Sequence, residues 1–163
     1  MNRLKWLLLA VALLLVGGAA WFFACPSNVQ LAFLRHEEIN GQRVAILRLE
    51  NRGSEPIFCR GKPGTPDYHF RANYADGVME GQGVPDSSGI PGDVRINPGE
   101  SMEFPARLRL SIHQREVSAP FQAAIKYTTP SLLRRHWFLH GIAFPYRFRP
   151  SIERMVWTDR VSE

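Results

Sequence analysis

The sequence predicts a mainly β protein, an antiparallel β-sandwich that follows one N-terminal transmembrane helix. Two observations favour the sandwich: several short runs alternate apolar and polar residues, and turns containing glycine or proline separate these runs. A third observation favours the helix, because 19 residues without a charge follow a basic N-terminus. No long amphipathic helix follows a strand, which argues against a parallel sheet built from βαβ units.

The uncharged run, residues 6–24, lies within an N-terminal region, residues 1–25, that is predicted to be a membrane anchor. An α-helix of that length covers about 28 Å, which is close to the hydrocarbon thickness of a bilayer. Arg3 and Lys5 precede the run, so the N-terminus is expected in the cytoplasm. The domain that follows, residues 26–163, is then expected outside the cytoplasm, in the periplasm or the extracellular space.

Two other interpretations of this segment stay open. In the first it is a cleaved signal peptide and the domain is secreted, because Trp6–Val16 suits the hydrophobic region and Gly17–Ala20 supplies small residues for cleavage. In the second, Cys25 is lipidated after cleavage, although the bulky Phe22 and Phe23 before it disfavour such a site. All three interpretations place the domain outside the cytoplasm.

A β-hairpin is the clearest pattern after the anchor. Apolar side chains recur at every second position in Val29–Phe33 and in Ala45–Leu49. Asn40-Gly41 lies between the two runs, and this pair suits the two positive φ angles of a type I′ turn.

Further strands and turns complete the predicted sandwich, and their spacing favours immunoglobulin-like connectivity. The segment 75–93, with five glycines, is expected to be a loop, and Ser131 and Gly141 are expected to begin and end a short helix. The remaining strands are expected around Ile57–Cys59, in Tyr68–Tyr74, in Met102–Leu110, in Phe121–Tyr127 and within residues 151–159, with a turn at Asn97-Pro98-Gly99.

Three features resemble those of small, uncharacterised bacterial proteins that carry a membrane-anchored immunoglobulin-like β-sandwich. They are the hydrophobic N-terminus, a strand that ends in Asn51-Arg52-Gly53-Ser54-Glu55-Pro56-Ile57, and the Pro98-Gly99-Glu100 turn before a later strand. The resemblance covers Val29–Tyr127. It implies a fold only, because strand and turn motifs assign no functional residue.

The charge distribution argues against nucleic-acid binding. The net charge is +5, but Arg3 and Lys5 supply two of these charges, and the remainder has 18 basic and 15 acidic residues. Nucleic-acid binding needs basic residues clustered on one face, so no nucleic-acid partner is expected.

The sequence contains no motif for catalysis, a cofactor or a metal. It lacks Gly-x-Ser-x-Gly, and its glycine-rich segment lacks the lysine of a phosphate-binding loop. His136 and His140 would share a helix face, but no third metal ligand accompanies them. The alternative is an enzyme or ligand-binding protein whose site is assembled from distant positions such as His69, His113 or the Asp76–Asp93 loop.

The two cysteines have two interpretations. Cys25 and Cys59 would form a disulfide in an oxidising compartment if Cys59 lies at the end of the sandwich nearest the membrane. Alternatively, Cys59 is a small buried apolar residue.

Residues 131–149 form the candidate interaction surface, because they mix arginine with aromatic residues as interface anchors and membrane-surface contacts do. The other interpretation is that the rings cover the open end of the sandwich. These patterns predict a non-catalytic, membrane-tethered interaction or structural module outside the cytoplasm, with the bilayer and another envelope protein as candidate partners. The candidate surface residues are Arg134, Arg135, Trp137, Phe138, Tyr146 and Arg147.

Overall fold

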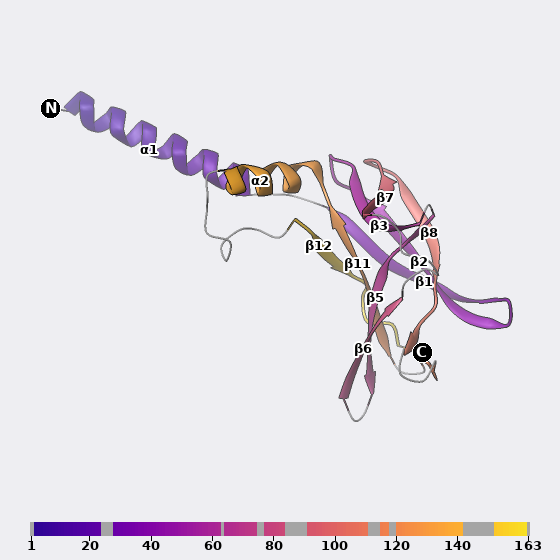
Figure 1. Cartoon of the computed structure of the whole chain (residues 1–163). Coiled ribbons are helices and arrows are strands. Elements are labelled where there is room, and N and C mark those ends of the chain that lie inside the picture. Colours follow the sequence, from indigo (N-terminus) through magenta and orange to yellow (C-terminus); the bar gives the residue numbers. More distant parts are fainter. Residues whose placement is uncertain are drawn as a thin grey trace.

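A computed structural model describes residues 2–23, 28–62, 64–74, 77–83, 91–110, 115–117, 120–141 and 152–162 (Figure 1). These residues are mainly β-strand, and the strands pair in antiparallel fashion, as predicted. In these described residues two helices accompany the strands: α1 (Asn2–Phe23) near the N-terminus and α2 (Pro130–Gly141), which follows the strand at Phe121–Thr128.

The first sheet has three strands in the order β1-β2-β8. It contains the predicted hairpin, which is confirmed: Asn40 and Gly41 have φ angles of 53° and 71°, as a type I′ turn requires. A type II turn around Gly99, with φ 78°, precedes the third strand. The strands are β1 (Val29–Ile39), β2 (Gln42–Asn51) and β8 (Ser101–Ala106).

The second sheet is built around a central strand that has partners along both edges. β12 pairs with one edge of this strand, while β3 and β5 pair with the other. β7 then pairs with β3, and β6 pairs with β5. The strands are β3 (Ile57–Lys62), β5 (Tyr68–Tyr74), β6 (Gly77–Gly83), β7 (Pro91–Ile96), the central β11 (Phe121–Thr128) and β12 (Arg154–Trp157).

β3 and β5 lie end to end along one edge of β11. Cys59 pairs with Tyr127 and Tyr68 pairs with Ile125, so the residues between them leave the ladder as a small hairpin. The backbone N–H of Asp67 donates to the carbonyl of Arg60 at 2.8 Å and closes this hairpin at its base. Its second strand is β4 (Thr65–Pro66), and one further short pair is β9 (Arg109–Leu110) with β10 (Arg115–Glu116).

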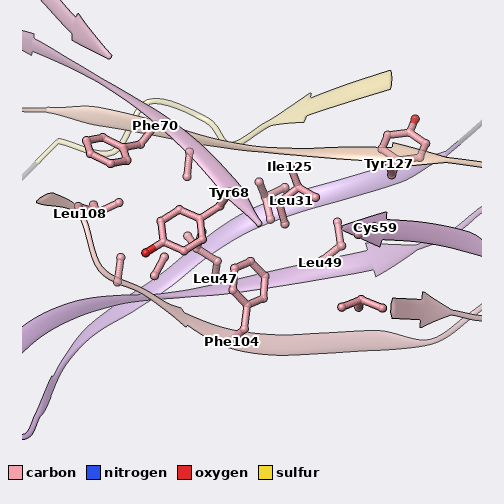
Figure 2. Close-up of a cluster of buried hydrophobic side chains, with 14 of the residues drawn as sticks. Leu31, Leu47, Leu49, Cys59, Tyr68, Phe70, Phe104, Leu108, Ile125 and Tyr127 are labelled. Atoms are coloured by element: carbon pink, nitrogen blue, oxygen red, sulfur yellow. The ribbon is translucent and has the colours of Figure 1, made fainter. Parts of the chain in front are cut away.

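The two sheets pack around one hydrophobic core, an arrangement consistent with the predicted β-sandwich. Leu47 and Leu49 of the first sheet and Phe70 and Ile125 of the second are at most 1% exposed and belong to the same buried cluster. Figure 2 shows these side chains between the strands of the two sheets. The alternation in the sequence therefore does identify the inward-facing positions.

The prediction of a loop at 75–93 needs correction, because the segment contains β6 and the start of β7. One of its glycines, Gly81, is required for packing. A Cβ atom built on Gly81 would lie 2.3 Å from the ring of Phe70, its partner on β5, so only glycine lets the two strands pair without displacing that ring. Glycine content indicated a loop, but the tertiary packing of Phe70 selects a strand.

The helix expected to cross the membrane is α1, whose described leucine side chains are exposed. Across the part of the chain that the structure describes, no helix combines the length and the apolar character needed to cross a membrane. The predicted transmembrane helix is therefore not found in that part, and the membrane anchor stays a prediction.

The hydroxyl of Tyr68 joins the two sheets. It donates a hydrogen bond of 2.8 Å to the carbonyl of Arg107 and accepts one of 2.6 Å from the N–H of the same residue, which follows β8 directly. The side chain is 4% exposed, so water does not easily replace it.

We expect Tyr68→Phe to lower the free energy of unfolding by about 1–2 kcal/mol, because it leaves two half-buried backbone groups of Arg107 without this partner. Urea denaturation measures the change. Tyr74→Phe is the matched control, since the buried hydroxyl of Tyr74 has no hydrogen-bond partner in the described part of the protein. Equal effects of the two substitutions would contradict this role of Tyr68.

Candidate interaction surface on helix α2

The start of α2 is defined by Thr129. Its Oγ1 accepts a hydrogen bond from the N–H of Leu132, and its carbonyl accepts the N–H of Leu133. Thr129 is therefore the N-cap, a position at which threonine is favoured. Pro130 occupies the first helical position, where an N–H would have no partner within the helix. The sequence expectation of Ser131 as the N-cap is wrong by two residues, while the helix does end at Gly141.

Glu55, in the loop between β2 and β3, holds the first turn of α2 against the sandwich. Its carboxylate accepts hydrogen bonds from the N–H and the hydroxyl of Ser131, and it pairs with Arg134 at 3.0 Å. Burial alone would raise the pKa of the Glu55 carboxyl, but the bonds from Ser131 and the charge of Arg134 together hold that pKa below its ordinary value. The negative charge also suits a helix N-terminus.

Asn51 fixes the loop that carries Glu55. Its side chain is fully buried, and its amide donates to the carbonyls of Glu55, at 2.8 Å, and Ile96, at 3.1 Å. Its Oδ1 accepts the N–H of Gly53 at 3.0 Å. Each polar group of the carboxamide except one lone-pair site is thus accounted for, which explains how a polar residue is tolerated in the core.

These contacts gather at one end of the sandwich, which we call the α2 pole: residue 28, residues 51–56, residues 97–100 and residues 129–134. The carbonyl of Asn28, just before β1, accepts the N–H of Arg52 at 2.8 Å, and the backbone of Asn51 bonds to Gly99 and Glu100. In Figure 1, α2 continues directly from this end of β11. The chain that leaves α1 therefore enters the sandwich at the pole that carries α2.

The outward face of α2 carries Arg134, Trp137 and Phe138, which share one side of the helix because they are spaced at i, i+3 and i+4. Trp137 is 68% exposed and Phe138 is 58% exposed. The opposite side, with Leu132 and Arg135, is buried. Large exposed aromatic side chains on a fixed helix are typical of interaction surfaces.

The structure therefore divides the predicted surface residues. It brings Arg134, Trp137 and Phe138 together on an exposed face and buries Arg135. Tyr146 and Arg147 lie outside the described residues, so their part in the surface stays a prediction. The described rings of α2 project outward, so they do not cover the open end of the sandwich.

A second aromatic and cationic cluster, which no sequence pattern predicted, lies on the outer face of the β5–β11–β12 sheet. The guanidinium of Arg71 stacks 4.5 Å from the ring centroid of Trp157 and donates two hydrogen bonds to Gln122. A cation over the face of an indole ring is held by electrostatic attraction to the ring. Alternation placed Arg71 on this face, but only strand pairing brings Trp157 beside it.

Of the groups considered for an enzymatic site, His69 lies on β5, and the charged groups that act on it include Lys126, Glu153 and Glu80. Burial lowers the pKa of His69, with a further contribution from Lys126, and burial raises the pKa of the neighbouring Asp67. No group of three or more histidine, cysteine, aspartate or glutamate residues in the described ranges could hold a metal ion. His113 and most of the Asp76–Asp93 segment lie outside the description of side chains.

Cys59 is 1% exposed in the core between the sheets and forms no disulfide within the described residues. Burial raises its pKa to about 12. Cys25 lies outside the described residues, so the pairing of the two cysteines stays a prediction.

No family model matches this sequence, and no curated protein matches it either. The resemblance to membrane-anchored bacterial sandwich proteins therefore stays an expectation from the sequence.

We expect Cys59 to resist thiol reagents in the folded protein. With a pKa of about 12, roughly one thiol in 10⁴ is ionised at about pH 8, and the residue is also inaccessible. Labelling of Cys25→Ser protein with a chromogenic disulfide should be slow without denaturant and complete in urea. Rapid labelling of the folded protein would contradict the burial of Cys59.

We expect Glu55→Ala to lower the free energy of unfolding by about 1 kcal/mol at neutral pH, because it removes the partner of Ser131 and Arg134. The folded-state pKa of Glu55 lies below its ordinary 4.5, so the stabilisation is present above that pH and is lost as the pH falls through the folded-state pKa. The difference from the wild-type protein should therefore shrink below about pH 4.5 in urea denaturation.

Glu37→Ala is the control for this measurement, since Glu37 forms an exposed ion pair with Arg35 on β1, outside the α2 pole. A difference between wild-type and Glu55→Ala protein that persists unchanged at low pH would show that the Glu55 carboxylate does not supply the stabilisation.

Proposed function

We propose that this protein is a β-sandwich of immunoglobulin-like connectivity that is tethered to a membrane by residues 6–24 and works outside the cytoplasm by binding. The observation that carries the proposal is the position of the exposed face of α2. That face, with Trp137 and Phe138, lies at the same pole of the sandwich at which the chain arrives from the apolar N-terminal helix.

Strand order supports the immunoglobulin-like connectivity. β1, β2 and β8 take the places of strands A, B and E in one sheet. In the other sheet, β12 and β11 take the places of G and F, β3 with β5 takes the place of C, and β7 with β6 that of C′. The two interruptions, at the small hairpin and between β6 and β7, leave this order unchanged.

The tether is supported by the sequence of the N-terminal helix. The run of residues without a charge extends from Trp6 to Ala24. Helical residues bond their own backbone groups, which a lipid environment requires. Arg3 and Lys5, both exposed, lie before the run and favour a cytoplasmic N-terminus.

Binding is supported by the kind of groups that the fold exposes. The α2 face presents tryptophan, phenylalanine and arginine, the residue types that contribute most to binding energy at interfaces. Because Glu55 and Asn51 hold α2 in place, these side chains are displayed on a fixed support, which lowers the entropy cost of binding.

The tether predicts that the full-length protein stays with the membrane after a carbonate wash, and that a reporter fused to the C-terminus is active only outside the cytoplasm. Leu9→Arg/Leu13→Arg should release the protein from the membrane fraction, because two charges in the run cost roughly 5–7 kcal/mol of insertion free energy. Leu9→Ala/Leu13→Ala is the matched control and should stay bound.

The mass of the mature protein separates the alternatives. Retention of residues 1–25 supports the anchor, whereas loss of about 20 residues would support a cleaved signal peptide. A cytoplasmic reporter, or wild-type protein freed by carbonate at full length, would refute the tether.

A further inference from the structure

The outward face of α2 has a position and a charge that fit an anionic lipid surface. Five Cα–Cα steps separate Phe23, the last residue of α1, from Asn28, so the sandwich begins at most roughly 18 Å from the end of that helix. Asn28 bonds to the loop that carries Glu55, and Glu55 bonds to the first turn of α2. If α1 ends at the outer surface of a bilayer, α2 is held close to the lipid headgroups.

The charge of the sequence interval that contains α2 is of one sign. The sequence has no acidic residue between Glu116 and Glu153, whereas Lys126 and four arginines lie in that interval. Glu55, from the loop between β2 and β3, forms an ion pair with Arg134, but 71% of the Arg134 side chain stays exposed. A guanidinium has five donors, so Arg134 has donors left for a phosphate or a carboxylate of a headgroup.

The aromatic residues beside this charge match the chemistry of the bilayer interface. Trp137 and Phe138 leave more than half of their surface in water, and the ring contacts of Trp137 in the described residues are with His136 and His140 of the same helix. Tryptophan prefers the depth of the headgroups, where its apolar ring is desolvated and its N–H stays wet. A helix with arginine next to such rings is typical of helices that lie in the interface plane.

We propose that α2 docks on the outer surface of the bilayer that holds the tether, with Trp137 and Phe138 inserted among the headgroups and Arg134 against anionic lipid. The inference rests on the proposed tether. It names the partner of the α2 face as the lipid surface in place of another envelope protein. Docking at this second point would fix the orientation of the sandwich above the membrane, because the tether and α2 meet at one pole.

The experiment places the full-length protein in two kinds of vesicle, phosphatidylcholine alone and phosphatidylcholine with about one-third phosphatidylserine. Both contain phosphatidylcholine brominated near the headgroup end of its chains, which quenches tryptophan at that depth. Trp6 and Trp21 belong to α1 and are common to every variant. Quenching that disappears in Trp137→Phe but persists in Trp157→Phe is then assigned to Trp137.

We expect quenching of Trp137 in the anionic vesicles and markedly less in the neutral ones. Arg134→Gln should shift the docking equilibrium by about fivefold towards the undocked state, since one basic residue near an anionic surface contributes roughly 1 kcal/mol. Arg134→Lys retains the charge and should retain the quenching. Circular dichroism checks that the variants keep their strand content.

Absence of quenching of Trp137 in anionic vesicles would overturn the docking, and equal quenching in both vesicle types would overturn the contact of Arg134 with anionic lipid. A blue shift of Trp137 without bromine quenching would replace the lipid by another occupant. The last result would place a protein, such as a second copy of this chain, over the α2 face. A carbonate wash of the same vesicles tests the tether separately. Protein that stays bound without quenching refutes the docking alone, and quenched protein that washes off refutes the tether alone.

Discussion

The buried carboxamide of Asn51 is the interaction on which the arrangement at the α2 pole depends. A neutral amide is costly to bury unless its donors and acceptor find partners, and the fold supplies them from Gly53, Glu55 and Ile96. The chain after Asn51 therefore turns, and the backbone of Asn51 forms hydrogen bonds with Gly99 and Glu100 in the turn before β8. That shape places the Glu55 carboxylate where α2 begins.

The second sheet shows how packing outweighs local composition. β6 contains three glycines and was expected to lie in a loop, yet it pairs along the whole of β5. The pairing works because the ring of Phe70 occupies the space that a side chain at Gly81 would need. At Gly81, which has no side chain, the apolar contact comes from the ring of Phe70 on β5.

The α2 face and the apolar N-terminal run are the two features on which the proposed function depends. A helix pinned at its first turn can expose tryptophan and phenylalanine without unfolding, because Thr129 and Glu55 satisfy the N–H groups there. The outer cluster of Arg71, Gln122 and Trp157 is held on a different surface, the open face of the β5–β11–β12 sheet. The sandwich thus displays aromatic and cationic side chains on two surfaces, the outward face of α2 and the outer face of the β5–β11–β12 sheet.

The sequence by itself determined the features that depend on local backbone preferences. Asn40-Gly41 specifies a hairpin turn because these residues tolerate positive φ, and alternation identifies strands because successive side chains point to opposite faces. The same alternation identified most of the core, while the anchor, the disulfide and the compartment stay predictions.

Only the tertiary structure decided which distant residues meet. Glu55 and Ser131 are 76 positions apart, and Arg71 and Gln122 are 51 apart, so no local pattern could pair them. Arg134 and Arg135 are neighbours in the sequence, yet one is exposed and the other buried, since a helix turns by about 100° per residue. The face that a helix buries is set by what packs against it, so the sequence of the helix alone does not decide it.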